Sequence, residues 1–224
     1  MERSFPTPAG TVDGEITRGA DHRPGAPLVV LAHGAGSDRR HPALVRIADA
    51  IAAAGYGVCR FDFPYRRAGR RIPDRMPVLL AAYGAVLDAL RADPSLAPAW
   101  VALGGRSLGG RVASHLVAAG ARADALLFLS FPLHPARRPD TARAAHLAVI
   151  RCPMLFVQGT RDALAEWPLL QATVDALPRA TLHALPDGDH ALAVPRRTRA
   201  PEAVDAEVDR AVVAWLDRVR GVTS

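Results

Sequence analysis

The chain has 224 residues, 50% of them hydrophobic, and is therefore long enough to bury a sizeable core. Charged residues make up 22% of it, with 18 glycines and 19 prolines, so the composition excludes a disordered or low-complexity chain. The formal net charge is +6, and all 28 basic residues are arginine.

Arginine without lysine, together with frequent alanine, is typical of a GC-rich bacterial genome. We therefore interpret the basic balance as a solvated surface and expect no nucleic-acid binding. Tight, steeply salt-dependent retention of duplex DNA would contradict this interpretation.

No targeting or membrane segment is visible in the sequence. The N-terminus lacks the apolar stretch of a signal peptide, and the longest apolar-rich run, residues 123–133, is too short to cross a bilayer. The two cysteines, Cys59 and Cys152, are too few for a disulfide framework and lack metal-binding spacing. We expect a cytoplasmic protein that does not contact membranes.

Short apolar runs alternate with longer stretches rich in alanine and leucine. The runs are continuous, as in LVVLA and ALLFLSF, which indicates strands covered on both faces. The longer stretches repeat apolar residues every three or four positions, which predicts helices. Predicted strands span residues 28–32, 57–61, 100–103, 125–131, 154–158 and 181–184. Predicted helices span residues 41–54, 77–92, 108–119, 164–176 and 201–220.

This order predicts an α/β fold with a mostly parallel, doubly wound sheet and helices on both faces. Two stretches fall outside the pattern: the arginine-rich residues 64–77, and residues 132–150, which are rich in proline, arginine and histidine. Loops of this length are often functional. No linker rich in serine and glycine divides the chain, so we expect one domain over residues 1–224, with its core at about residues 26–220.

A glycine-rich motif, GGRSLGG, follows the predicted strand at 100–103 and opens the next helix. This is the context of a G-x-S-x-G nucleophile elbow, in which a sharp turn exposes a serine above the sheet. Glycines flank the serine because side chains there would contact the neighbouring backbone. The motif makes Ser107 a candidate nucleophile, and a packing turn with an unused serine is the alternative.

A serine nucleophile needs a histidine to take its proton and a carboxylate to orient that histidine. In folds with such an elbow the partners follow in the order Ser, Asp or Glu, His, each after a later strand. Asp162 follows the strand at 154–158, and His190 follows the strand at 181–184. Taken singly, Asp162 fits a helix N-cap and His190 a surface loop. Their joint placement predicts a catalytic triad.

An attacked carbonyl develops negative charge on its oxygen, which two backbone N–H groups must stabilise. One donor should belong to Leu108, the residue after the candidate nucleophile. The second should come from the loop HGAGSD after the strand at 28–32, from Ala35 or its neighbour Gly36. A phosphate-binding loop is the alternative, but this loop lacks the lysine, followed directly by serine or threonine, of a P-loop.

Other polar residues near the strand ends fit supporting roles. We expect His33 to order the loop that it opens. Asp62 is a further carboxylate at the active edge of the sheet, and capping of a loop is the alternative. Asp187 and Asp189 flank His190 and are alternative carboxylates for orienting it. The remaining histidines show no metal-ligand spacing, so the sequence predicts neither a metal site nor a cofactor.

Many motifs in register resemble the α/β-hydrolase superfamily from Leu28 to Arg220. Within it, the chain is similar to the compact, dienelactone-hydrolase-like branch that includes testis-expressed and NSL-complex-subunit proteins. The motifs that carry this resemblance are HGAG, RFDFPY, GRRIPDR, GGRSLGGR, FPLHP, RCPMLFVQGTRD and GDH. The resemblance implies a minimal hydrolase without a large lid, with Ser107, Asp162 and His190 as its triad. Dienelactone hydrolases themselves use a cysteine nucleophile, which argues against a dienelactone substrate.

The sequence thus predicts a serine hydrolase that cleaves a small ester or related acyl compound through an acyl-enzyme intermediate. The alternative is a catalytically silent module of the same fold that binds a partner in a protein complex. Arg70 and Arg71 are candidates for binding anionic acyl groups through bidentate contacts. A salt-bridged loop, in which they pair with carboxylates such as Asp62 or Asp74, is the alternative.

Overall fold

The computed structural model describes residues 1–19 and 22–221. Its centre is an eight-stranded sheet in the order β1-β2-β4-β3-β5-β6-β7-β8. The strands are β1 (Glu2–Phe5), β2 (Val12–Thr17), β3 (Leu28–Ala32), β4 (Gly57–Phe61), β5 (Val101–Arg106), β6 (Ala125–Leu129), β7 (Met154–Gly159) and β8 (Ala180–Leu185). β2 pairs with β1 and with β4 in antiparallel fashion, whereas every pairing among β3 to β8 is parallel.

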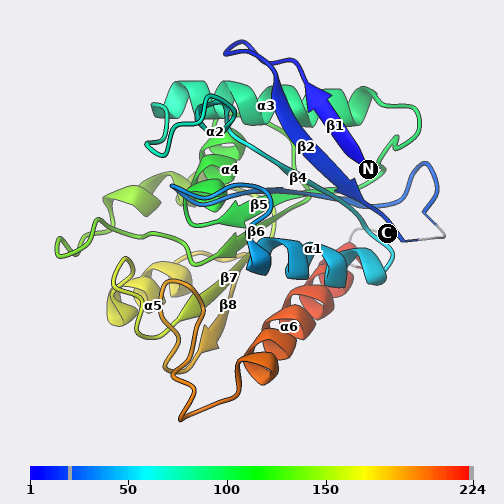
Figure 1. The fold of residues 1–224 in the computed structure, drawn as a ribbon. Helices are drawn as coiled ribbons and strands as arrows, with labels where there is room; N and C mark the ends of the chain where they lie inside the picture. The colour runs from blue at the N-terminus through cyan, green and yellow to red at the C-terminus, as the bar shows by residue number, and fades with distance from the viewer. Residues whose placement is uncertain (20–21, 222–224) are drawn as a thin grey trace.

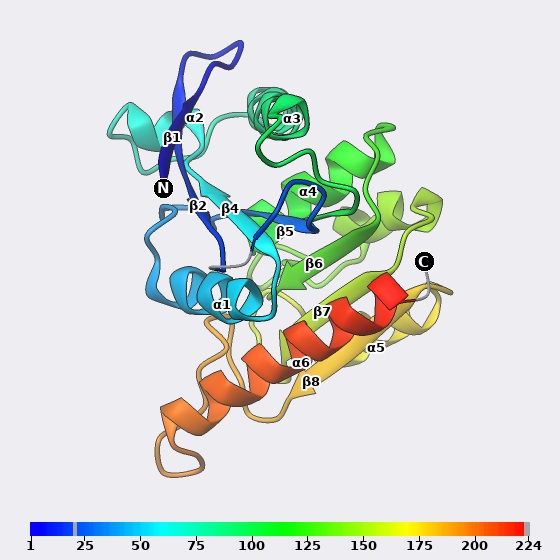
Figure 2. The ribbon, with the colours of Figure 1, turned by 90° about the vertical axis from the view of Figure 1, so that its right-hand side faces the viewer.

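Helices cover both faces of the sheet (Figures 1 and 2). They are α1 (Pro42–Ala53), α2 (Pro64–Arg67), α3 (Met76–Ala92), α4 (Leu108–Ala118), α5 (Trp167–Asp175) and α6 (Pro201–Gly221), with a 3-10 helix, η1 (Ala142–Val149). The apolar residues of α1 and α6 form one core with the sheet, and those of α3, α4 and α5 form another. This arrangement confirms the predicted α/β class with a doubly wound, mostly parallel sheet.

The two cores explain why the central strands are continuously apolar. Every residue of β3 is buried. Val29 and Leu31 point to the core with α1 and α6, whereas Val30 and Ala32 point to the opposite core. Because successive side chains of a strand alternate between faces, a strand covered on both sides favours apolar residues at every position.

The predicted boundaries hold best for the central strands. β3 and β4 coincide with their predicted ranges to the residue. β5 continues three residues beyond its predicted end because Gly104, Gly105 and Arg106 still pair with β6. α5 begins at residue 167 rather than 164, because a turn around Asp162 precedes it.

The hairpin formed by β1 and β2 was not predicted, and the core begins well before residue 26. Phe5, Val12 and Ile16 are 3%, 0% and 2% exposed. The inward positions of β2 alternate as expected of a strand, but the middle one is Gly14, where a Cβ would lie 2.6 Å from a ring carbon of Phe5. A glycine at an inward position hid the apolar alternation from the sequence.

The two irregular stretches contain short helices that the sequence did not predict. α2 lies in residues 64–77, and η1 lies in residues 132–150. Helices this short carry too few turns for a periodic apolar pattern. Among residues 1–19 and 22–221, no helix is long and apolar enough to cross a membrane.

Candidate active site

Ser107 lies on the turn between β5 and α4, with φ 50° and ψ −111°, a backbone conformation that costs energy in a residue with a side chain. Neighbouring glycines make the turn possible. Gly105 has φ +151°, and a Cβ on Gly109 would lie 2.1 Å from the carbonyl oxygen of Ala32. The structure therefore has the strand–turn–helix geometry that the glycine pattern predicted, and Ser107 stands at the carboxyl edge of the parallel strands.

The structure brings Ser107, His190 and Asp162 together. His190 Nε2 lies 2.9 Å from Ser107 Oγ, and His190 Nδ1 lies 2.7 Å from Asp162 Oδ2. Because an ionised carboxylate only accepts, Nδ1 carries the proton and Nε2 is free to accept one from the hydroxyl. These side chains come from the loops after β5, β7 and β8, whose parallel strands end at one edge of the sheet.

Asp162 is fixed by its own surroundings. Its side chain has no exposed surface, Oδ1 accepts the N–H of Leu164 at 2.8 Å, and Oδ2 also accepts the side-chain amide of Gln158. Since α5 begins only at Trp167, Asp162 is not the N-cap of that helix. Gln158 was missed by sequence reasoning, although it is the only polar side chain in the apolar run of β7.

The aspartates beside His190 have structural roles. Asp189 Oδ1 accepts the N–H groups of Ala191 and Ala193 at 2.7 and 3.0 Å. The N–H of Asp187 donates to Thr160 Oγ1 at 2.9 Å. Neither carboxylate contacts the imidazole, so these residues shape the loop that carries His190.

The loop after β3, residues 34–38, lies against the candidate nucleophile, and we refer to it as the oxyanion loop. A Cβ on Gly34 would be 3.6 Å from the Ser107 Cβ. Within the described part of the chain, no acceptor occupies the backbone N–H of Ala35 or of Leu108. Both groups are thus available to an external oxygen. The backbone of Gly36 instead contacts the phenol of Tyr65, whose pKa burial raises to about 12.

His33 orders the start of the oxyanion loop, as the sequence predicted. It is completely buried, its Nδ1–H donates to the carbonyl oxygen of Gly34 at 2.8 Å, and its Nε2 accepts the N–H of Phe63 at 3.1 Å. Acceptance at Nε2 requires the neutral ring, and burial lowers the pKa of His33 accordingly.

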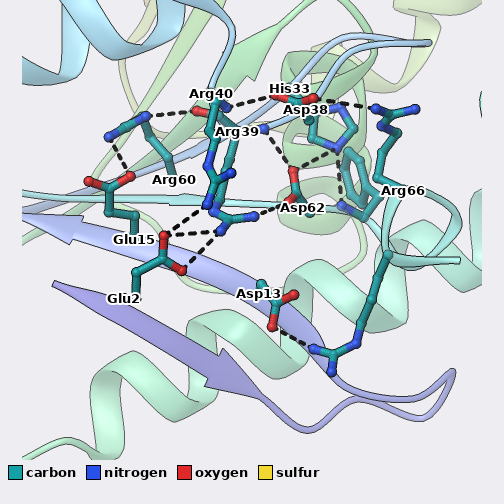
Figure 3. Close-up of polar contacts among 12 residues, drawn as sticks. Glu2, Asp13, Glu15, His33, Asp38, Arg39, Arg40, Arg60, Asp62 and Arg66 are labelled. Atoms are coloured by element: carbon teal, nitrogen blue, oxygen red, sulfur yellow. Dashed lines mark hydrogen bonds and ion pairs between the residues drawn. The ribbon is translucent and has the colours of Figure 1, made fainter. Parts of the chain in front are cut away.

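Asp62 orders the end of the same loop (Figure 3). Its Oδ1 accepts the backbone N–H of Arg39 at 2.7 Å, and its Oδ2 accepts the Arg39 guanidinium. The structure therefore gives Asp62 the loop-capping role that was its alternative, with an ion pair added to it.

A family model described as an alpha/beta hydrolase domain matches residues 25–218. The chain belongs to the α/β hydrolase domain family. The match runs from just before β3 to near the end of α6, and it leaves the hairpin β1–β2 outside.

Solved structures share this α/β hydrolase fold at low sequence identity. An α/β serine hydrolase homologue from Coxiella burnetii matches with a TM-score of 0.78 at 17% identity, over 96% of this chain and 97% of that one. An α/β serine hydrolase without a lid, from Xanthomonas campestris, gives 0.74 at 20%, over 96% and 94%. A dienelactone hydrolase from Anabaena variabilis gives 0.76 at 17%, over 97% and 96%. The predicted α/β-hydrolase fold without a large lid is therefore shown.

The arginine-rich segment of this α/β hydrolase is held by ion pairs. Arg66 binds Asp38 at 3.3 Å, and Arg70 binds Asp74 at 2.7 Å. The salt-bridged alternative thus describes Arg70, although its partner is Asp74 and not Asp62. Arg71 is exposed.

A second cluster of titratable groups lies between α4 and η1. The rings of His115 and His146 stack with their centroids 3.6 Å apart, and Ser114 Oγ lies 2.7 Å from His146 Nε2. Burial, with the charges of His115 and Arg111, lowers the pKa of His146 to about 4. In residues 1–19 and 22–221, no three potential ligands among His, Cys, Asp and Glu gather around one point as a metal would require.

Proposed function

We propose that this protein is a serine hydrolase that cleaves a small ester or related acyl compound, with Ser107, His190 and Asp162 as its catalytic triad. The observation that carries the proposal is the pair of contacts at His190, 2.9 Å to Ser107 Oγ and 2.7 Å to Asp162 Oδ2. Hydroxyl, imidazole and carboxylate in this order are what activation of a serine requires.

The first half of the reaction forms an acyl-enzyme. Ser107 Oγ attacks the ester carbonyl carbon while His190 Nε2 takes the hydroxyl proton, and Asp162 stabilises the imidazolium. When the tetrahedral intermediate collapses, the bond to the alcohol oxygen breaks, and His190 returns the proton to the leaving alcohol. The acyl group remains on Ser107.

The second half releases the acid. His190 takes a proton from water, whose oxygen attacks the acyl carbon, and collapse of the second intermediate returns the proton to Ser107. In both halves the N–H groups of Leu108 and Ala35 stabilise the oxyanion, whereas the backbone of Gly36, the other predicted donor, is engaged by Tyr65. These steps use only side chains, backbone N–H groups and water, so the proposal includes no cofactor.

Three features favour turnover over a silent binding module. Ser107 is held in a strained backbone conformation, Asp162 is a buried carboxylate, and two backbone N–H groups beside Ser107 have no acceptor within the described residues. The first two cost free energy that a scaffold has no reason to spend, and the two N–H groups are open to an external oxygen. The relatives from Coxiella and Xanthomonas are also described as serine hydrolases.

The test is the mass of the intact protein after treatment with a fluorophosphonate. Attack by an activated serine forms an Oγ–phosphorus bond and expels fluoride, so we expect one adduct on the wild type. Ser107→Ala should form none, His190→Ala should react slowly, and the control Ser4→Ala on the hairpin should react like wild type. Folded wild type that forms no adduct with this reagent or with a smaller sulfonyl fluoride would favour the binding module.

Several finer expectations stay predictions. These are the similarity to testis-expressed and NSL-complex-subunit proteins, a cytoplasmic location, the absence of nucleic-acid and membrane binding, and the selection of anionic acyl groups by Arg70 and Arg71. The pairing of Arg70 with Asp74 favours the structural alternative for that residue.

A further inference from the structure

The hairpin β1–β2 lies outside the family-matched residues 25–218 and pairs with β4. Two glutamates lie directly opposite each other in it, Glu2 on β1 and Glu15 on β2. Like charges at opposed positions destabilise a strand pair. The hairpin therefore needs basic partners from elsewhere in the chain.

Three arginines supply that charge (Figure 3). Glu2 binds Arg39 at 3.0 Å and Arg40 at 3.2 Å, and Glu15 binds Arg60 at 3.0 Å. A hydrogen bond from Arg40 and the charge of Arg39 lower the pKa of the Glu2 carboxyl. The hairpin is thereby tied to the residues that directly follow the oxyanion loop.

Arg39 links Glu2 to the buried carboxylate of Asp62. Arg39 is 7% exposed, and both its guanidinium and its backbone N–H donate to Asp62. Its carbonyl oxygen accepts from Arg60 Nη1 at 2.7 Å. Glu2 therefore holds the side chain of Arg39. Glu15, acting through Arg60, holds its backbone.

The oxyanion loop is fixed at both of its ends. Asp62 Oδ1 accepts the N–H of Arg39, directly after the loop, and Nε2 of His33, directly before it, accepts the N–H of Phe63. The arc that carries Ala35 and Gly36 is thus held at both ends by the adjacent residues 62 and 63.

A gain in folding stability does not explain the buried ion pair between Arg39 and Asp62 well, because desolvation of two charges offsets most of their attraction. A role in fixing the geometry of the loop explains the pair better. A guanidinium fixes direction through its planar fork, and a misplacement of about 1 Å in a catalytic group can cost about 100-fold in rate.

We infer that the hairpin glutamates, Glu2 and Glu15, are positioning residues that hold the oxyanion loop through Arg39. The catalytic consequence of this contact rests on the proposed function. Weakening the network should loosen the loop and lower kcat while KM stays nearly constant, because the loop donors act on charge that develops in the transition state.

The experiment compares network variants with hairpin controls. Arg39→Met removes the guanidinium fork, and Glu2→Gln combined with Glu15→Gln removes the hairpin charges without changing the loop. Arg3→Met and Arg67→Met break the other ion pairs of the hairpin, to Asp93 and Asp13, which do not reach the loop. Each variant is measured by amide hydrogen exchange of residues 33–40 and by kcat and KM for p-nitrophenyl acetate.

Exchange should become about tenfold faster in Arg39→Met, because the loop then opens more often. Its kcat should fall about 10- to 100-fold, and that of the paired glutamine variant about 3- to 10-fold, with KM changed less than about twofold. Arg39→Lys should recover part of both losses. The controls should match wild type.

Two results would overturn the inference. One is unchanged exchange in the folded paired glutamine variant, or in folded Arg39→Met. The other is an equal effect in the Arg67→Met control. If the wild type hydrolyses no ester and forms no adduct on Ser107, the proposed function fails, whereas hydrogen exchange still decides whether the hairpin orders the loop.

Discussion

The two sides of Ser107 are held by different physical means. On the side of His190, close backbone contacts position the groups, and a Cβ on Gly159 would lie 2.2 Å from the carbonyl oxygen of Gly188. On the side of the oxyanion loop, arginines and carboxylates position them, with Asp62 and Arg39 at the centre. Backbone contact tolerates no added atom, whereas an ion-pair network tolerates gradual weakening. Substitutions at the close backbone contacts should therefore have large effects, whereas substitutions in the ion-pair network should have graded ones.

The largest expected effect distinguishes two carboxylates on the His190 side. Asp162→Asn should lower kcat by about 10³- to 10⁴-fold, because an amide no longer holds the Nδ1–H tautomer of His190. Asp189→Asn should change kcat by less than about threefold, since the amide oxygen still accepts from the loop. Steady-state kinetics on the same ester checks both. Similar losses in the two variants would contradict the assignment of Asp162.

The next effect compares two glycines. Gly109→Ala should destabilise the fold by about 3 kcal/mol or more, because its Cβ meets the backbone of β3 at 2.1 Å and backbone cannot move aside. In Gly84→Ala the Cβ meets only a Leu116 methyl at 3.7 Å, so the variant should gain up to about 1 kcal/mol of helix propensity. Urea midpoints measure both effects. An unchanged midpoint in Gly109→Ala would show that the elbow can shift to accommodate a side chain.

A smaller effect concerns pH and the histidine pair between α4 and η1. Because the pKa of His146 falls to about 4 on folding, the unfolded state binds a proton that the folded state does not between about pH 6.5 and 4. The contribution of His146 to the free energy of unfolding should therefore be constant above this window and fall by roughly 2 kcal/mol through it, after allowance for partial exposure.

The control for this effect is His146→Gln, which keeps a polar partner for Ser114 and cannot titrate. Urea midpoints at pH 7.5 and 4.5 should decline less in this variant than in wild type. Equal declines would show that other groups control acid stability. Glu2 and Asp38, which bind arginines at the oxyanion loop, have lowered pKa values, so their ion pairs should persist through this window.

The smallest effect concerns the exposed arginines. Arg70→Ala should cost less than about 0.5 kcal/mol, because an exposed i,i+4 ion pair contributes little. If Arg70 and Arg71 do not contact the substrate, the double variant Arg70→Ala, Arg71→Ala should leave the ratio of kcat/KM for carboxylated and neutral esters unchanged. A fall in this ratio would instead assign them to substrate selection.

Local pattern was enough to predict much of the fold. β3 and β4 were correct to the residue because strands covered on both faces are mostly apolar, although β4 also carries the buried Arg60. The elbow was recognisable because its glycines are required by close contacts within a short stretch. The hairpin was not predicted because Gly14 interrupts the alternation of apolar residues in β2. The helix η1 was not predicted because 3-10 turns lack a sustained apolar period.

The residues of the candidate site were likewise predictable only in part. Ser107, Asp162 and His190 were predictable because each follows a strand, and parallel strands bring their ends to one edge. Gln158 was not, because a polar residue at the end of a buried strand carries no pattern that names its partner.

The sequence by itself thus determined the layers, the elbow and the order of the three site residues, since these depend on local period and on steric requirements of the backbone. Only the tertiary structure decided which charges meet. Glu2 and Arg39 are far apart in the chain and join through the edge pairing of β2 with β4. The sequence does not indicate which of its 28 basic residues pairs with Glu2, because charged residues show no periodicity that specifies their partners.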